Sequence, residues 1–186
     1  MKRLFLLFTL VVFALCANAQ SVTKFLGIPV DGTEYAFKNK LKAKGFKDSK
    51  VVDGALEGEF NGEDVYVSVQ TQSGKVWRVS VMDKTFRDET QIRIRFNNLL
   101  DMFYSNKKYL SHPNNEFLSQ MEDIEYEIAV HNKQYQAVFY QKLEEDSLLN
   151  SYDRTVWFRI GGKSYPGYVI VLYYENNLNE ADGSDL

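Results

Sequence analysis

The spacing of apolar positions predicts two main helices. In the first, Phe37 and Leu41 lie one helical turn apart and face the interior. We expect Asp31 to cap this helix and Gly45 to end it in a Schellman motif. The second helix is predicted over about residues 89–106, where apolar residues recur at helical spacing. Each helix has one apolar stripe, which is typical of helices that pack on a single layer.

Seven further segments alternate between apolar and polar residues or are rich in β-branched and aromatic residues, which predicts strands. They are residues 55–60, 63–71, 75–82, 124–130, 134–141, 154–160 and 168–174. Because the strands come in runs and do not alternate singly with helices, the order predicts an α+β fold. We expect an antiparallel sheet of about seven strands with the two helices packed on one face. The same order is compatible with two helix-plus-strands units.

The first nineteen residues have the pattern of a cleaved secretory signal peptide. Lys2 and Arg3 precede an apolar run of roughly 13 residues, which is shorter than the ~20 that a membrane span needs. Small residues then precede a cleavage site after Ala19, so we expect a periplasmic or extracellular protein. A lipoprotein anchored through Cys16 is the less favoured alternative, because no small residue precedes that cysteine.

Cleavage changes the chemistry that the chain offers. The chain has a single cysteine, Cys16, so the expected mature domain, residues 20–175, has no disulfide or thiolate site. Losing two basic residues changes the net charge from −3 to about −5. An acidic chain without a basic stripe argues against nucleic acid, and no second apolar stretch is long enough to span a membrane. Residues 176–186 are acidic and asparagine-rich, and we expect them to be a disordered tail.

Several short motifs are distributed along most of the mature chain. They are Phe25-Leu26-Gly27-Ile28-Pro29-Val30-Asp31-Gly32, Lys44-Gly45-Phe46, Lys108-Tyr109, Pro113, Glu116-Phe117, Tyr168-Val169-Ile170-Val171, Tyr173 and Asn176-Asn177. This set resembles an uncharacterised family of secreted bacterial proteins. The resemblance implies a β-lactamase-inhibitor-protein-like fold, in which helices pack on an antiparallel sheet and which often serves binding. It implies no catalytic residues, and a function inferred from the fold is an analogy only.

Residues suited to catalysis are few. The two histidines have no second ligand at metal-binding spacing, so we predict no metal site and no cofactor. The carboxylate pairs Glu57/Glu59 and Glu125/Glu127 each lie two residues apart in predicted strands. Glycoside hydrolysis needs two carboxylates at a set separation in a cleft, whereas this spacing is also typical of a solvated sheet face. We therefore assign no catalytic residue.

Aromatic side chains are the more informative feature, since they make up 15% of the chain. Four of them, Tyr66, Tyr140, Trp157 and Tyr173, fall on strand positions opposite the better apolar stripe. If they align across the sheet, they form an aromatic surface of the kind that Tyr and Trp build at interfaces. The alternative is that helices and loops, such as residues 144–153, cover both faces of the sheet, because large exposed patches are uncommon in monomers.

The favoured interpretation is an exported, non-enzymatic binding domain that holds an unknown protein or envelope component on this aromatic face. One alternative is a small secreted hydrolase acting on glycans, with carboxylates in a cleft. Another is a structural, homo-oligomeric envelope protein, in which a second copy covers the same face.

Overall fold

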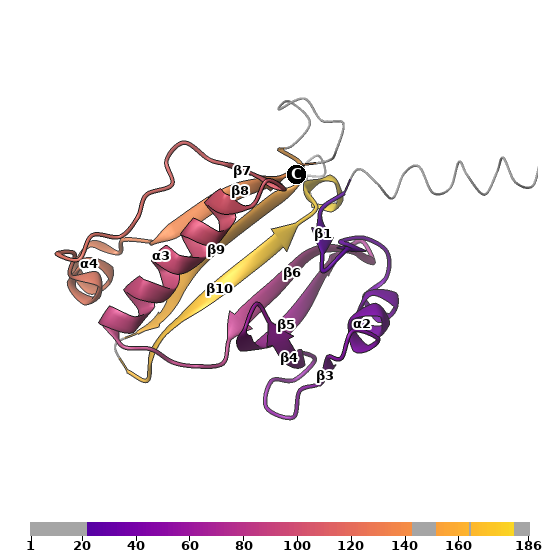
Figure 1. The fold of residues 1–186 in the computed structure, drawn as a ribbon. Coiled ribbons are helices and arrows are strands. Elements are labelled where there is room, and N and C mark those ends of the chain that lie inside the picture. Colours follow the sequence, from indigo (N-terminus) through magenta and orange to yellow (C-terminus); the bar gives the residue numbers. More distant parts are fainter. Residues whose placement is uncertain (1–21, 143–151, 164, 181–186) are drawn as a thin grey trace, which may run out of the picture.

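In the computed structural model, which describes residues 22–142, 152–163 and 165–180, the centre of the fold is an eight-stranded antiparallel sheet (Figure 1). The strand order is β3–β4–β5–β6–β10–β9–β8–β7. The strands are β3 (Lys47–Asp48), β4 (Leu56–Phe60), β5 (Glu63–Gln72), β6 (Lys75–Asp83), β7 (Tyr109–Ser111), β8 (Gln136–Gln141), β9 (Thr155–Lys163) and β10 (Gly167–Glu175). A separate two-stranded sheet pairs β1 (Lys24–Phe25) with β2 (Ile28–Pro29). The predicted α+β class with a large antiparallel sheet is confirmed. Six of the seven predicted strands are present, and two short edge strands, β3 and β7, bring the sheet to eight.

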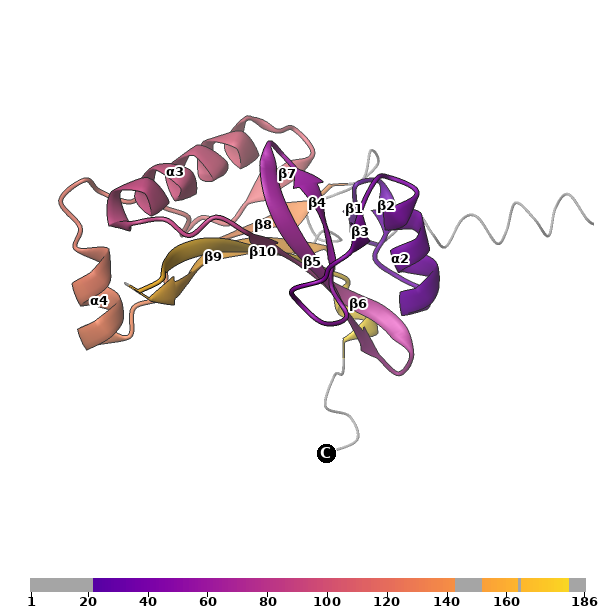
Figure 2. The same cartoon turned by 90° about the horizontal axis from the view of Figure 1, so that it is seen from below.

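The described part of the chain contains three α-helices, which are α2 (Glu34–Lys42), α3 (Glu89–Ser105) and α4 (Ile124–His131). Helix α2 packs on β5 and β6, and α3 packs on β7, β9 and β10. Their buried side chains join one apolar cluster with residues on the inner face of the sheet, including Val67, Val79, Phe158 and Leu172. The sheet is strongly twisted, so that the β4–β5 hairpin rises toward α3 (Figure 2).

The helix ends follow the predicted capping chemistry with one correction. Thr33, not Asp31, caps α2, because its hydroxyl accepts a hydrogen bond from a backbone N–H three residues later at 3.3 Å. Asp88 caps α3 in the same way at 2.8 Å. The Schellman ending is confirmed, since Gly45 has a φ of 100°. The N–H of Phe46 reaches back to the carbonyl five residues earlier at 3.3 Å.

The strand predicted at residues 124–130 is wrong, because this segment is helix α4. Asp123 caps the helix by accepting a hydrogen bond from the N–H of Tyr126 at 2.8 Å, and Asn132 ends it in a left-handed conformation with a φ of 52°. Ile124 is the one residue of the helix that is buried. The alternation of apolar residues therefore did not mark an inner and an outer face, and the caps at both ends decided the structure.

Residues 176–180 are packed against the sheet, so the expected disorder is wrong for them. Asn176 is 1% exposed, and its N–H donates to the carbonyl of Trp77 at 2.7 Å. Its side-chain amide donates to the carbonyl of Val30 at 2.9 Å. A 3-10 helix, η3 (Asn177–Asn179), follows. The asparagine amides supply the hydrogen bonds that hold this segment, although it has almost no apolar side chains, and residues 181–186 lie outside the described residues.

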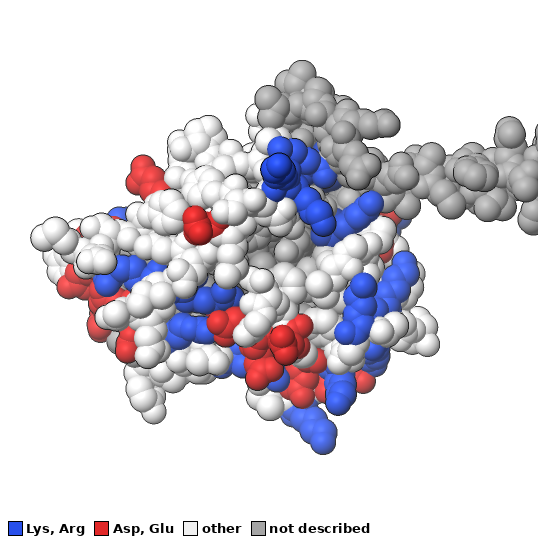
Figure 3. Space-filling model, in the orientation of Figure 1, with Lys and Arg blue, Asp and Glu red and all other residues white. Residues whose placement is uncertain are grey.

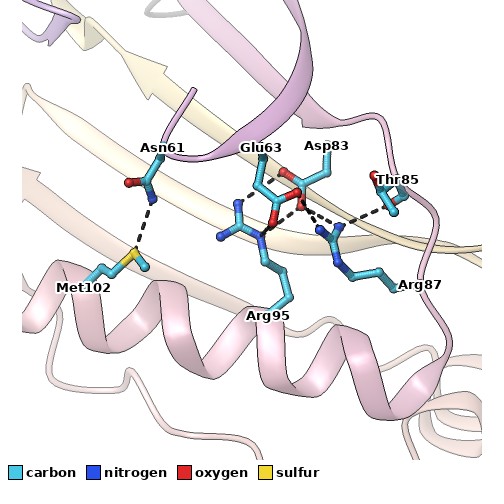
Figure 4. A network of polar contacts seen from close by, with 7 residues as sticks. All are labelled: Asn61, Glu63, Asp83, Thr85, Arg87, Arg95 and Met102. Carbon is cyan, nitrogen blue, oxygen red and sulfur yellow. Dashed lines mark hydrogen bonds and ion pairs between the residues drawn. The ribbon is translucent and has the colours of Figure 1, made fainter. Parts of the chain in front are cut away.

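An ion-pair network ties α3 to the sheet (Figure 4). Asp83, at the end of β6, is 4% exposed, and its carboxylate pairs with Arg87 at 2.9 Å and with Arg95 of α3 at 3.0 Å. Glu63 of β5 pairs with Arg87 at 2.7 Å and lies 3.6 Å from Arg95. Two carboxylates and two guanidinium groups thus balance each other between the helix and the sheet.

Some predictions concern segments outside the described residues. The signal peptide at residues 1–19, its cleavage site and most of the loop at 144–153 fall there. Over the described ranges, no helix combines the length and the apolar character that crossing a membrane requires. Export therefore stays a prediction.

Candidate functional site

The strand pairing places Trp157 and Tyr173, two of the four aromatic residues singled out from the sequence, in one row across the sheet. Trp157 on β9 pairs with Val138 on β8 and with Tyr173 on β10. Tyr173 also pairs with Ser80 on β6, which pairs with Ser68 on β5. Because directly opposite residues in an antiparallel pair point to the same side, these five residues form one row across five strands. We call the side of the sheet that carries this row the outer face; α2 and α3 pack on the inner face.

Tyr66 and Tyr140 lie at the two ends of the outer face, by the same alternation along β5 and β8. The Lys84 ammonium is 4.8 Å from the centre of the Tyr66 ring and forms an ion pair with Glu57 at 3.0 Å. At the other end, Tyr140 packs edge-on against Tyr152 with ring centres 4.9 Å apart. Burial raises the pKa of the Tyr140 phenol, with a smaller contribution from Tyr152, so this hydroxyl stays protonated and can donate a hydrogen bond.

Four side chains at the centre of the outer face form a continuous stack. The rings of Trp157 and Tyr173 are stacked, with centres 4.2 Å apart and planes inclined by 19°. The Arg78 guanidinium lies over Tyr173 at 5.4 Å and over Trp77 at 4.0 Å from the ring centres. Glu175 fixes this guanidinium through a hydrogen bond from Nε at 2.6 Å. We call Trp77, Arg78, Tyr173 and Trp157 the aromatic stack, in which Tyr173 contacts both Trp157 and Arg78.

Trp77 reaches the outer face because of a β-bulge. Regular alternation predicts that Trp77 lies on the inner side with Val79. The register between β5 and β6 shifts between Gln70 and Thr71, and Val76 and Val79, three residues apart, are both fully buried. The extra residue in β6 turns Trp77 to the side of Tyr173, where both rings contact the same guanidinium.

Two polar atoms of the outer face have no hydrogen-bond partner within the part of the chain that the structure describes. They are Ser80 Oγ, in the row described above, and Arg159 Nε, two residues along β9 from Trp157. Arg159 also has no ion pair among those residues. Both atoms lie beneath the surface, and a polar group that is shielded from water without a partner costs roughly 1–3 kcal/mol. Tyr66, Tyr140, Trp157 and Tyr173 are each half-buried, with part of the ring open to solvent.

The carboxylate pairs considered for a hydrolase do not converge. Glu125 and Glu127 lie on helix α4, where residues two apart point to different sides, and Glu127 contacts His131 at 3.0 Å. Glu57 of the other pair is already ion-paired with Lys84. Across residues 22–142, 152–163 and 165–180, no group of three or more His, Cys, Asp or Glu side chains is arranged to hold a metal ion.

The inner side of the sheet contains a cavity that the sequence pattern does not reveal. Its volume is about 1300 Å³, and it lies between α3, the tips of the β1–β2 and β4–β5 hairpins and the ends of β7 and β8. Leu172 and Tyr174 of β10 form its floor, and Glu59 of the second carboxylate pair lies at its wall. Its lining comes from segments far apart in the chain, so no local motif marks it.

Comparison with other proteins identifies no relative of this chain. No protein-family model, curated protein or solved structure matches this chain. The resemblance to a secreted family with a β-lactamase-inhibitor-protein-like fold stays a prediction, and the case for function rests on the geometry of the outer face and of the cavity.

Proposed function

We propose that this chain is an exported, non-enzymatic binding domain that holds a protein partner on the outer face of its sheet, around Trp157 and Tyr173. The observation that carries the proposal is the aromatic stack, which lies half-exposed on the sheet face opposite α2 and α3. Tyr, Trp and Arg are enriched at the energetic centre of protein interfaces. Tyr and Trp bury large areas with only two rotatable bonds, and Arg offers a planar group that stacks on rings and pairs with carboxylates.

The geometry favours a protein over a glycan. Sugar rings bind by lying flat on an exposed aromatic face, but the Tyr173 ring is already stacked on Trp157 and lies next to the Arg78 guanidinium. The outer face instead offers ring edges, hydroxyl groups and the unpaired Arg159 guanidinium. A protein surface with an apolar centre and a carboxylate opposite Arg159 complements these groups.

A second copy of the chain is the alternative occupant. In a two-fold symmetric interface, Arg159 needs a carboxylate from the same face of the other copy. Glu57 and Glu175 already pair with Lys84 and Arg78, whereas Asp64, which alternation along β5 places on the same side as Tyr66, is exposed and has no ion pair among the described residues. A second copy of the chain is therefore the occupant that the capture experiment has to distinguish from a different protein.

Affinity capture from envelope extracts tests the proposal. The variant Tyr66→Ala/Trp157→Ala is expected to lose the captured partner, because it removes two anchors of the outer face. The matched control is Tyr35→Ala/Tyr126→Ala, which removes two tyrosines that are 78% and 51% exposed on α2 and α4. If wild type and the Tyr66→Ala/Trp157→Ala variant capture the same proteins equally well, the outer face is not the binding surface.

A further inference from the structure

The cavity on the inner side lies between α3, the two hairpin tips and the ends of β7 and β8. The side chains of Asn61, at the tip of the β4–β5 hairpin, and Met102, on α3, meet at 3.3 Å and close one side (Figure 4). Figure 3 shows the molecular surface hollowed on this face, with Lys or Arg side chains gathered above the hollow. The cavity arises because α3 packs on β7, β9 and β10 while α2 packs on β5 and β6, which leaves a gap between the two helices.

The cavity lining is polar and apolar in about equal parts, and aromatic rings supply much of the apolar part. Tyr174 on the floor packs against Phe25 with ring centres 5.0 Å apart, and Phe60 from β4 lies 6.5 Å from Tyr174. On the α3 side, the rings of Phe103 and Tyr109 meet edge-on at 4.8 Å. Four of these rings, those of Phe60, Phe103, Tyr109 and Tyr174, line the space directly. The aromatic part of the lining suits an apolar chain or ring system, and the polar part suits a polar headgroup.

Three lysines from distant segments meet at the same cavity, namely Lys24, Lys108 and Lys142. The N–H of Lys142 donates to the carbonyl of Lys108 at 2.8 Å, which sets these two residues side by side. The side-chain amide of Gln141 accepts from the N–H of Lys24 at 2.7 Å and donates to its carbonyl at 3.0 Å. These contacts fix Lys24 beside the other two.

None of the three lysines has a carboxylate partner within the described part of the chain. Glu59 is the one acidic residue in the described lining. In a chain whose net charge is −3, a gathering of unpaired ammonium groups at one cavity creates a local positive potential. An anion bound there relieves the repulsion between them.

We propose that this cavity binds a monomeric anionic amphiphile, a molecule with a carboxylate or phosphate headgroup on an apolar chain. The headgroup lies against Lys24, Lys108 and Lys142, and the chain extends over Leu172 and Tyr174. A volume of about 1300 Å³ is ample for a twelve-carbon chain, since the pockets that hold drug-sized ligands measure roughly 300–1000 Å³. This site lies on the side of the sheet opposite the aromatic stack and is independent of the proposed protein partner.

The neutral polar groups of the cavity are compatible with such a ligand. Burial raises the pKa of the Tyr174 phenol, and contact with the Tyr109 hydroxyl raises it further. Tyr174 therefore stays uncharged and places no negative charge next to the headgroup.

Isothermal titration of the exported protein with probes below their micelle concentration tests the proposal. Dodecanoate and dodecyl phosphate are expected to bind with one-to-one stoichiometry. Dodecanol, which lacks the charge, and acetate, which lacks the chain, are expected to bind about tenfold more weakly or not at all. The relative affinity for dodecanoate and dodecyl phosphate identifies the preferred headgroup.

Two pairs of variants test the roles of the cavity lysines and of the cavity space, each against a matched control. Lys108→Ala/Lys142→Ala changes two exposed side chains and is expected to weaken dodecanoate binding about tenfold. Lys47→Ala/Lys75→Ala removes two exposed lysines outside the cavity and is expected to leave binding unchanged. Met102→Trp, which fills the space from α3, is expected to abolish binding, whereas Trp157→Ala on the outer face is expected to keep it.

Four results would overturn the proposal. They are no binding of either anionic probe by the wild type, equal binding of dodecanol, equal losses in the two lysine pairs, and binding only to phosphatidylglycerol vesicles. The last result would indicate a membrane surface and not a monomeric ligand.

Discussion

Replacing Asp83 with alanine is expected to lower the free energy of unfolding by about 3 kcal/mol. Asp83 is 4% exposed and accepts hydrogen bonds from Arg87 at 2.9 Å and from Arg95 at 3.0 and 3.3 Å. Without it, Glu63, at 3.6 Å, is the only carboxylate left to Arg95 among the described residues, and the Arg95 side chain is only 11% exposed. A largely buried guanidinium that has lost its main partner is strongly destabilising. Urea unfolding followed by circular dichroism measures the change.

Matched variants test whether the effect comes from the unpaired charge. Asp101→Ala removes an exposed carboxylate from α3, and its effect is expected to stay within about 0.5 kcal/mol. Asp83→Leu/Arg95→Met removes both charges and is expected to recover much of the lost stability, since an apolar replacement of a buried ion pair is often neutral. A loss in the double variant as large as in Asp83→Ala would mean that the charge is not the cause.

Truncating both rings at the centre of the aromatic stack, as Trp157→Ala/Tyr173→Ala, is expected to weaken binding of the protein partner about 100-fold or more. These rings stack at 4.2 Å, and Tyr173 also supports the Arg78 guanidinium, so their removal disorders the centre of the outer face. Affinity for the captured partner, measured by surface plasmon resonance, gives the change.

Trp157→Phe is the conservative comparison, because phenylalanine keeps a ring to stack on Tyr173. Its loss of affinity is expected to be much smaller than that of the double alanine variant. The affinity of Tyr35→Ala, which changes an exposed ring on α2, is expected to equal that of the wild type. Equal losses in all three variants would show that the outer face has no special role.

The sequence carries most of the fold because its signals are local. Asp88 and Gly45 mark the ends of helices, and strong alternation marks the long strands. Prediction was wrong where a local pattern had two interpretations. The apolar residues of 124–130 alternate as in a strand, but the caps Asp123 and Asn132 make the segment a helix. The asparagines after residue 175 looked like a tail, but their amides reach carbonyls across the sheet.

The candidate sites depend on pairings that local patterns do not contain. Alternation could place Trp157 and Tyr173 on the outer sides of their strands, but only the register of β9 and β10 sets one ring on the other. Trp77 joins them because of a bulge, which reverses the side that alternation predicts. The cavity lysines Lys24 and Lys142 are more than a hundred positions apart in the chain, and the side-chain amide of Gln141 brings them together by bonding to the backbone of Lys24.

Site-specific photo-cross-linking tests most directly whether the outer face is the binding surface. A benzophenone amino acid replaces one tyrosine at a time, at Tyr66 and Tyr140 on the outer face or at Tyr35 and Tyr126 on the exposed sides of α2 and α4. Cells that export the protein are irradiated, and the products are identified by mass spectrometry. The proposal predicts one and the same partner protein cross-linked from Tyr66 and Tyr140 and none from Tyr35 or Tyr126. Products from the control positions alone, or a product of twice the mass of this chain from Tyr66 and Tyr140, would contradict it.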